Sequence, residues 1–339
     1  MKARHVCLSL ALACLLAAVP ARRAQAAGQG APAATPPFDQ LVRLFDYDPN
    51  ADLDVQETKV HDKDRAQIRV ITYASPKGGR VTAYLVTPKG AGPFAGIVFL
   101  HRGQDDKSSF LAEALLYARA GAVSLLIDAP FIRPAPWTNS GGGGLGDPGA
   151  DREMYTQTVV DVRRGLDLLA ARRDVDPKRI GYVGHSFGAT WGGVIAGVEK
   201  RFRAHVLMAG YARLSSDTFE TQHPTLSTAF ARLPKEALDK YIAATESLDA
   251  IHYIGHAAPA PILFQFARFD IFISEDQAKE YERAASQPRQ TRWYDTGHEL
   301  NDLEALRDRS DFLTAQLGLN TIDDLMMKKL HLGGASGGK

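Results

Sequence analysis

A short stretch around position 186 has the composition and spacing of a nucleophilic site. Gly184-His185-Ser186-Phe187-Gly188 follows the predicted strand 179–183 and precedes residues with helical character. A serine between a strand and a helix sits on a sharp turn, which needs glycines because side chains there would clash. Its hydroxyl then lies at the carboxyl edge of a sheet, near a helix N-terminus that favours negative charge. We therefore predict that Ser186 is a nucleophile.

A serine hydroxyl is a weak nucleophile unless a base takes its proton, and His298 is the best candidate for that base. It follows the last predicted strand, 292–294, so its loop leaves the sheet at the same edge as Ser186. A lone loop histidine is often only surface decoration, and its position at this edge argues against that interpretation.

The base needs a carboxylate that orients it, and Asp270 follows the predicted strand 261–266. Glu275 and Asp276 compete for this role, but they fit better as the cap and first-turn acids of the next helix. The expected triad is Ser186, Asp270 and His298, in the chain order of the α/β-hydrolase triad.

Two backbone N–H groups are expected to bind the oxyanion. One belongs to Phe187, directly after the nucleophile, and the other to Gly103 or Gln104 in the loop after the run 96–100. Arg102 and His185 are candidate substrate contacts. Arg102 either points into the site and favours anionic substrates, or points outward and pairs on the surface.

Apolar runs alternate with helical stretches along the chain. Strands are predicted at 68–73, 81–86, 96–100, 122–127, 179–183, 204–208, 261–266 and 292–294, and helices at 38–45, 109–120, 151–172, 189–198, 275–285 and 303–317. Such alternation implies βαβ crossovers, so we expect an α/β fold with a doubly wound, mostly parallel sheet. The opening hairpin supplies an antiparallel edge.

Residues 211–257 interrupt the alternation after the sixth predicted strand and are expected to form an inserted cap. Their apolar side chains either line the substrate site or pack only among themselves and against the sheet. The side chains in question are Phe219, Phe230, Leu233, Tyr241 and Ile242.

The N-terminus is typical of a secretory signal peptide. Residues 1–26 have a basic start, a short apolar run and the small-x-small site Ala24-Gln25-Ala26, which predicts cleavage near Ala26 and a secreted or periplasmic protein. We expect a tether with a short helix at 27–50, the main domain at 51–330 and a disordered tail at 331–339.

Charge and cysteine content exclude several classes of protein. The formal net charge is +1 without basic blocks, so nucleic acid is not an expected partner. No stretch after the signal peptide is long and apolar enough for a membrane span. Both cysteines, Cys7 and Cys14, lie in the signal peptide, which excludes a disulfide, a cysteine nucleophile and Cys-ligated zinc. We expect no metal and no cofactor, and the oligomeric state stays open.

From about Val81 to Leu317 the sequence resembles the α/β-hydrolase family, in its dienelactone hydrolase and acetyl xylan esterase-like branch. The resemblance rests on FLHRG, LLIDAP, VDPKRIGYVGHSFGA, VLMAG, PILFQFARFD and DTGH. It implies the fold and the triad, and says far less about the substrate. Family members usually have His-Gly where this chain has His101-Arg102, which shifts the second oxyanion donor by up to one residue.

The expected function is an exported serine hydrolase that cleaves a small-molecule carboxylic ester. A peptidase of the prolyl oligopeptidase type shares the motifs, although too few residues precede the first predicted strand for a propeller domain. A non-catalytic binding protein on the same fold is an alternative of another class, but such proteins typically lose a triad member. An acyltransferase would use the same acyl-enzyme.

Overall fold

The computed structural model describes residues 36–63, 65–142 and 145–322. The predicted signal peptide (1–26), the predicted tail (331–339) and the first part of the predicted tether lie outside the described residues. Within the described ranges, no helix is long and apolar enough to cross a membrane.

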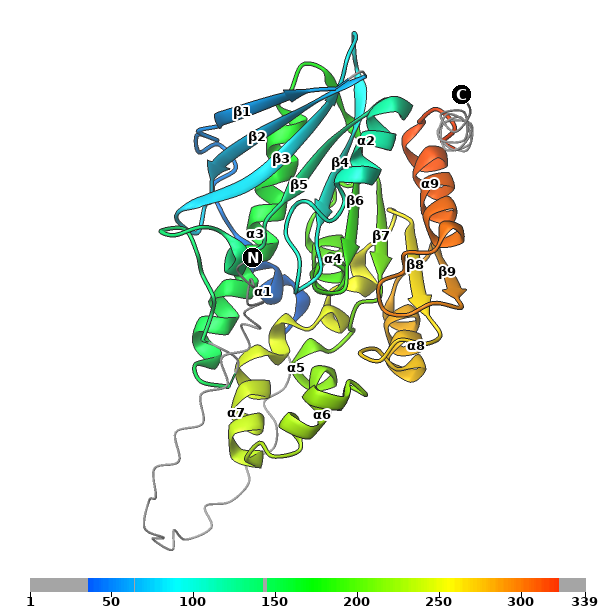
Figure 1. Cartoon of the computed structure of the whole chain (residues 1–339). Helices are drawn as coiled ribbons and strands as arrows, with labels where there is room; N and C mark the ends of the chain where they lie inside the picture. The colour runs from blue at the N-terminus through cyan, green and yellow to red at the C-terminus, as the bar shows by residue number, and fades with distance from the viewer. Residues whose placement is uncertain (1–35, 64, 143–144, 323–339) are drawn as a thin grey trace, which may run out of the picture.

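One mixed sheet organises the described chain (Figure 1). Its strands are β1 (Gln56–Asp62), β2 (Ala66–Ala74), β3 (Arg80–Pro88), β4 (Phe94–Leu100), β5 (Ala122–Ile127), β6 (Val175–His185), β7 (Ala204–Met208), β8 (Ile262–Ala267) and β9 (Arg289–Tyr294). They lie in the order β1-β2-β3-β5-β4-β6-β7-β8-β9. The pairs from β1 to β5 are antiparallel, and those from β5 to β9 are parallel. The predicted α/β class with a mostly parallel sheet is therefore confirmed.

The sequence analysis missed the first strand. Every residue of β1 is exposed, because this strand lies at the sheet edge and pairs only with β2. Its residues, QETKVHD, do not alternate between apolar and polar, so no period-2 signal marks them. As a consequence, residues 211–257 follow the seventh strand of the sheet rather than the expected sixth.

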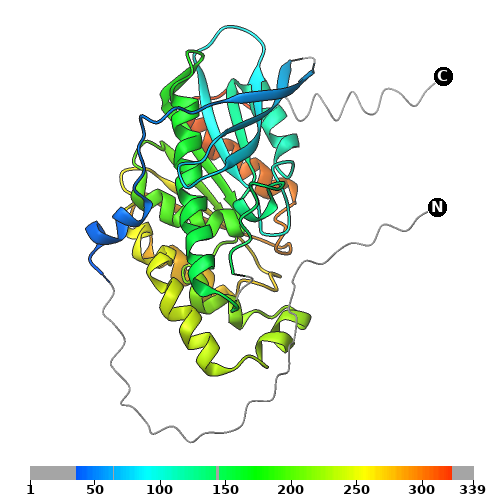
Figure 2. The same ribbon diagram turned by 90° about the vertical axis from the view of Figure 1, so that its left-hand side faces the viewer.

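Helices cover both faces of the sheet (Figure 2). On one face, α2 (Leu111–Ala120) and α9 (Leu303–Leu317) are joined by a hydrogen bond of 3.3 Å between the hydroxyls of Tyr117 and Ser310. On the other face, α3 (Pro148–Ala170), α4 (Phe187–Val198) and α8 (Glu275–Ala284) pack together, and Tyr281 donates to the carbonyl of Ala189 at 2.8 Å. This coverage buries the strands β4 to β8 on both faces, as their apolar sequences predicted.

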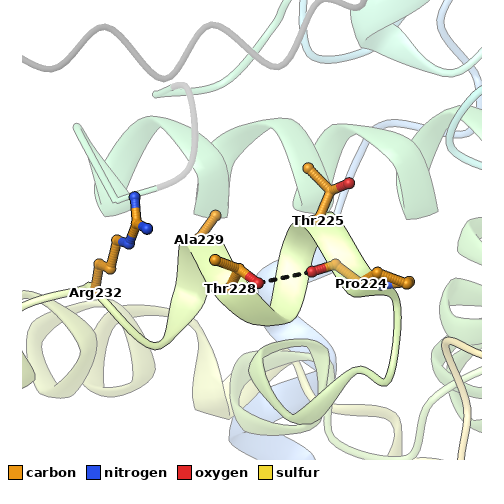
Figure 3. Close-up of a pocket in the computed structure, with 5 residues that line it drawn as sticks. All are labelled: Pro224, Thr225, Thr228, Ala229 and Arg232. Atoms are coloured by element: carbon orange, nitrogen blue, oxygen red, sulfur yellow. Dashed lines mark hydrogen bonds between the residues drawn. The ribbon is translucent and has the colours of Figure 1, made fainter.

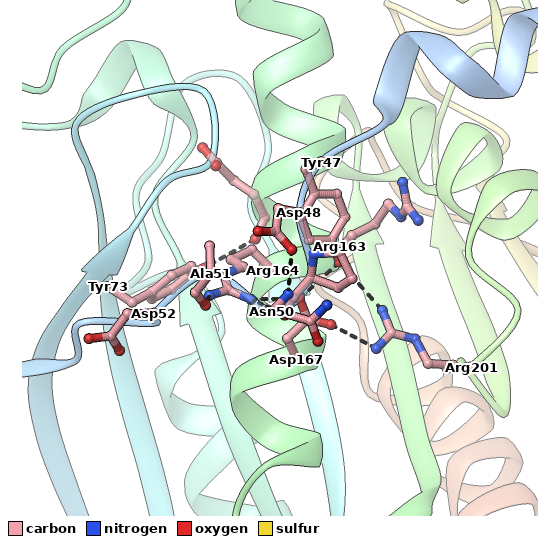
Figure 4. A network of polar contacts seen from close by, with 12 residues as sticks. Tyr47, Asp48, Asn50, Ala51, Asp52, Tyr73, Arg163, Arg164, Asp167 and Arg201 are labelled. Carbon is pink, nitrogen blue, oxygen red and sulfur yellow. Dashed lines mark hydrogen bonds and ion pairs between the residues drawn. The ribbon is translucent and has the colours of Figure 1, made fainter.

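The segment after α1 (Phe38–Val42) is fastened to α3 by a polar network (Figure 4). Tyr47 donates to Asp167 at 2.9 Å, and Arg201 binds the other oxygen of the same carboxylate at 2.7 Å. Arg164 donates to the carbonyl of Pro49 at 3.0 Å. Burial, together with the nearby Asp167 charge, raises the pKa of Tyr47 to about 12, so its hydroxyl remains a donor.

The inserted residues 211–257 form three helices, α5 (Leu214–Asp217), α6 (Pro224–Phe230) and α7 (Lys235–Thr245), with 3₁₀ turns between and after them. They leave the carboxyl end of β7. In Figure 1 they lie below the sheet, on the side toward which β7 and β8 point. Strand ends of this kind are where ligands bind in α/β sheets.

Candidate functional site

Ser186 occupies a strained turn between β6 and α4. Its backbone has φ 52° and ψ −107°, an uncommon conformation for a residue other than glycine. A side chain at Gly188 would collide with the carbonyl of Leu100, and one at Gly184 would collide with the carbonyl of Gly188. The turn therefore needs both glycines for the steric reason that the sequence suggested, and it leaves Ser186 half-buried at the sheet edge.

His298 and Asp270 are in direct contact. Nδ1 of His298 lies 2.7 Å from Oδ2 of Asp270, and the two side chains are 8% and 2% exposed. The other carboxylate oxygen of Asp270 accepts the backbone N–H groups of Phe272 at 2.8 Å and Ile273 at 3.0 Å. Because a carboxylate only accepts, Nδ1 of His298 carries the proton, and Nε2 presents a lone pair.

The competing acids lie elsewhere. Glu275 and Asp276 belong to the first turn of α8, whose N-cap is Ser274 in a capping box with Gln277. Glu275 pairs with Lys279 at 2.7 Å along the same helix. Among the described residues, neither acid forms a hydrogen bond with His298, whereas Asp270 does.

Ser186 and His298 leave the sheet at the same edge, after β6 and after β9. In the part of the chain that the structure describes, no hydrogen bond joins the Ser186 hydroxyl to the imidazole. The ring of His185, the neighbour of Ser186, lies with its centroid 5.4 Å from that of His298. Without a bound substrate, catalytic hydrogen bonds are often long, so this arrangement is compatible with a triad.

The residues predicted to bind the oxyanion lie near one another. Phe187 begins α4, and the first N–H groups of a helix have no acceptor within it. Gly103 and Gln104 are the central residues of a turn that the N–H of Asp105 closes on the carbonyl of Arg102 at 3.2 Å. A Cβ built on Gly103 would stand 4.0 Å from the Cβ of Phe187, so this turn faces the start of α4.

Arg102 is held by two carboxylates. Its Nε donates to Asp105 at 2.6 Å, and its guanidinium also pairs with Glu299. Glu299 directly follows His298, so the arginine links the turn after β4 to the loop after β9. This geometry corresponds to the outward, paired arrangement of Arg102.

His185 is buried and points at the backbone of His298. Its Nε2 lies 2.7 Å from the carbonyl oxygen of His298, and the residue is 7% exposed. Burial, reinforced by the nearby His298, lowers the pKa of His185 to about 3. The residue is therefore a neutral donor to the chain rather than an open contact for a ligand.

His101 is a residue to which the sequence analysis assigned no role. Its Nε2 accepts the backbone N–H of Ala129 at 3.0 Å, and its Nδ1 lies 2.6 Å from the carbonyl of Arg102. These contacts tie the turn after β4 to the loop after β5, and burial lowers the pKa of the ring. The sequence signals for this residue were its place at the end of a buried strand and in the FLHRG motif.

Aromatic rings surround the side chain of Phe187. The centroid of Phe131 lies 5.1 Å from it, that of Trp191 6.0 Å and that of Tyr155 6.3 Å. Trp191 is buried, whereas Phe131, Tyr155 and Phe187 are half-buried. These rings thus cluster around the side chain of the residue that follows the predicted nucleophile.

Three of the apolar side chains singled out in the inserted segment pack on one another. The ring of Phe219 lies 5.1 Å from that of Phe230 and 5.5 Å from that of Tyr241. Tyr241 alone of these three extends toward Phe187, through a hydrogen bond of 3.0 Å between its hydroxyl and that of Tyr155. Tyr241 is therefore the member of the set best placed to influence a substrate.

A separate pocket of about 460 Å³ lies along α6 (Figure 3). It is lined by Pro224, Thr225, Thr228, Ala229 and Arg232. None of the predicted site residues contributes to it, so it is distinct from the Ser186 region.

A family model described as the prolyl oligopeptidase family matches residues 138–270. This stretch is less than half of the chain and includes Ser186 and Asp270 but not His298. No curated protein matches the sequence.

Several solved structures are similar over most of the chain. An acetyl xylan esterase from a Paenibacillus species is 21% identical, with a TM-score of 0.67, and the match covers 83% of this chain and 93% of that one. One from a Thermoanaerobacterium species is 15% identical, with the same TM-score and coverage. A cold-adapted esterase from an Arctic intertidal metagenomic library is 16% identical, with a TM-score of 0.53 and coverage of 77% and 99%. The chain has the α/β-hydrolase fold, and the predicted resemblance is confirmed at that level.

Proposed function

We propose that this protein is a serine hydrolase that cleaves carboxylic esters through an acyl-enzyme, with Ser186, His298 and Asp270 as its triad. The observation that favours this most is the buried 2.7 Å contact between His298 and Asp270, at the sheet edge where Ser186 stands on its strained turn. The esterases among the structural neighbours agree with it.

In the first half-reaction, Nε2 of His298 accepts the proton of the Ser186 hydroxyl as its oxygen attacks the ester carbonyl carbon. Asp270 keeps Nδ1 protonated, so that Nε2 is the basic nitrogen, and it stabilises the imidazolium that forms. Two backbone N–H donors compensate for the negative charge on the former carbonyl oxygen. We assign them to Phe187 and to Gly103 or Gln104, and losing one such donor typically costs about 10²–10³ in kcat.

When the tetrahedral intermediate collapses, the alcohol leaves with the proton from His298, and the acyl group stays on the Ser186 oxygen. Water then attacks the acyl carbon while His298 takes its proton, and a second collapse releases the acid and restores the serine. Every proton transfer uses the same nitrogen, so no cofactor is required for this chemistry.

The favoured substrate is a neutral ester. Arg102, the nearest candidate for recognising a carboxylate, already pairs with Asp105 and Glu299. The half-buried rings of Phe131, Phe187 and Tyr155 offer neutral apolar contacts instead. Binding a charged acyl group there would remove its hydration without a partner, which is unfavourable.

A panel of p-nitrophenyl esters of increasing acyl length, with acetylated sugars and peptide anilides alongside, tests the reaction class. We expect ester hydrolysis in the wild type, and a loss of up to about 10⁶-fold in kcat for Ser186→Ala, because the nucleophile acts as a unit with its base. Wild-type turnover in the alanine variant would exclude the mechanism.

A peptidase of the prolyl oligopeptidase type is the second candidate, and the family match over residues 138–270 favours it. Both reactions use the same acyl-enzyme, so only the leaving group separates them. Hydrolysis of short peptide anilides with kcat/KM above that of the best ester would establish the peptidase.

We also propose that the protein is exported, with cleavage after Ala26, on the basis of the N-terminal sequence. N-terminal sequencing of protein from the culture medium or periplasm tests this. Mature protein should begin at or near Ala27, whereas intact Met1 in the cytosol would contradict export.

A further inference from the structure

The turn that carries His298 has a conformation that must be held from outside. Residues 297–300 are closed by a hydrogen bond of 3.1 Å from the N–H of Leu300 to the carbonyl of Gly297. Leu300 is fully buried and has φ 47°, in the left-handed region that a leucine rarely adopts. Such a conformation persists only where the surrounding structure over-determines it.

One of the groups that hold this turn is the ring of His185, the last residue of β6. Its Nε2 lies 2.7 Å from the carbonyl oxygen of His298. A carbonyl oxygen only accepts, so Nε2 of His185 carries the proton and donates it. This donor fixes the backbone of the very residue whose side chain is oriented by Asp270.

The two contacts on His298 act at different atoms. Asp270 holds the imidazole at Nδ1, and His185 holds the main chain at the carbonyl oxygen. With both ends fixed, little freedom remains for the direction in which Nε2 points. Placement of this kind matters because a shift of about 1 Å in a reacting group can cost about 10²-fold in rate.

We propose that His185 is a positioning residue, which holds the backbone of His298 so that its imidazole stays aligned between Asp270 and Ser186. This assignment rests on the proposed serine-hydrolase function. It replaces the expected substrate contact, because the Nε2 of His185 is already engaged and the ring is only 7% exposed.

The charge state of His185 suits this task. Burial keeps its pKa far below neutrality, at about 3, so the ring is neutral where esterases are assayed. A neutral ring with its proton on Nε2 donates one hydrogen bond and adds no positive charge beside His298. The imidazolium that forms on His298 during the reaction is therefore not opposed by a neighbouring cation at position 185.

Three substitutions at this position separate the hydrogen bond from the packing. His185→Gln carries an amide N–H at nearly the same reach as Nε2, so it can donate to the His298 carbonyl. His185→Asn carries the same group one carbon shorter and falls short of that carbonyl. His185→Met fills a similar volume without any donor.

His205→Met is the matched control. His205 is a fully buried histidine in β7 whose ring nitrogens have no hydrogen-bond partner among the described residues. It packs beside Tyr182 and Phe202, away from the residues assigned to catalysis. Replacing His205 shows what the loss of a buried imidazole does to kcat when no hydrogen bond to His298 is lost.

We expect kcat on the best ester to fall by about 10–100-fold in the Met and Asn variants, with KM within about twofold, because alignment is lost rather than binding. His185→Gln should recover most of this loss, and His205→Met should keep the wild-type kcat whatever its melting temperature.

Equal kcat in all three variants and the wild type would overturn the assignment, as would a Gln variant no more active than the Asn variant. If the Met variant does not fold, the Gln and Asn pair still decides, because both keep a polar amide. Ser186→Ala is measured in parallel: its turnover tests the proposed function, whereas the order of the position-185 variants tests only the role of His185.

Discussion

Replacing Asp270 by asparagine should reverse the tautomer of His298. One carboxylate oxygen of Asp270 accepts two backbone N–H groups, from Phe272 and Ile273, at 2.8 and 3.0 Å. In Asp270→Asn the amide oxygen must take this place, since the NH₂ group cannot accept from them. The NH₂ group then faces Nδ1 of His298 and can only donate to it, which leaves the imidazole proton on Nε2.

A proton on Nε2 prevents His298 from accepting the proton of Ser186. The size of the effect follows from the well-studied serine protease triad, where the same substitution lowers kcat by about 10⁴. That loss corresponds to about 5.4 kcal/mol of transition-state stabilisation, at about 1.36 kcal/mol for each factor of ten. The fold should survive, because the two backbone bonds to residue 270 are retained.

Steady-state hydrolysis of a p-nitrophenyl ester, with the melting temperature followed in parallel, measures this. Asp276→Asn is the matched control: it removes an acid from the first turn of α8 and should leave kcat unchanged. A folded Asp270→Asn protein with more than a tenth of the wild-type kcat would refute the tautomer reasoning.

Four further substitutions have definite expected outcomes. Arg102→Gln should lower kcat/KM for an anionic ester and for a neutral ester by the same factor. This factor should be below about fivefold, because the ion pairs of Arg102 are partly exposed. Unequal losses on the two esters would mean that the guanidinium recognises the charge of the substrate. Tyr241→Ala should change the ratio of kcat/KM between acetyl and longer acyl esters about tenfold. Phe230→Ala should change only the melting temperature. If neither variant changes that ratio, the inserted segment has a structural role and does not select the substrate. Arg133→Met leaves the fully buried Asp161 without its ion-pair partner. The free energy of unfolding, measured with urea, should fall by about 3–5 kcal/mol. A decrease below about 1 kcal/mol would contradict this expectation.

The parts of the fold with a strong local pattern were predictable. The continuous apolar runs of β5 and β7 and the amphipathic α9 have the bounds that the sequence indicated. The sequence analysis began the helix α3 at residue 151, three residues after its first residue in the structure. In the structure the side chain of Asp147 caps the helix and accepts hydrogen bonds from the N–H groups of residues 149 and 150. Pro148 is the first residue of the helix, a position where the missing N–H of proline costs no hydrogen bond.

The positions of Ser186 and His298 at the carboxyl edge of the sheet were predictable, because each residue follows a strand. The contacts of Arg102 with Glu299 and of His185 with His298 were not predictable, because these partners are far along the chain, in the loop after β9. Glu299 is 197 residues from Arg102, and His298 is 113 residues from His185. No period or motif encodes such a pairing, since it arises only when the loops meet at the sheet edge.

The most direct test of the central claim is the mass of the protein after reaction with a fluorophosphonate, followed by peptide mapping. A serine hydrolase activated by His298 should take up one phosphonyl group, located on Ser186, and Ser186→Ala should take up none. A label on another residue, or an unlabelled wild-type protein that hydrolyses esters at full rate, would contradict the assignment of Ser186 as the nucleophile.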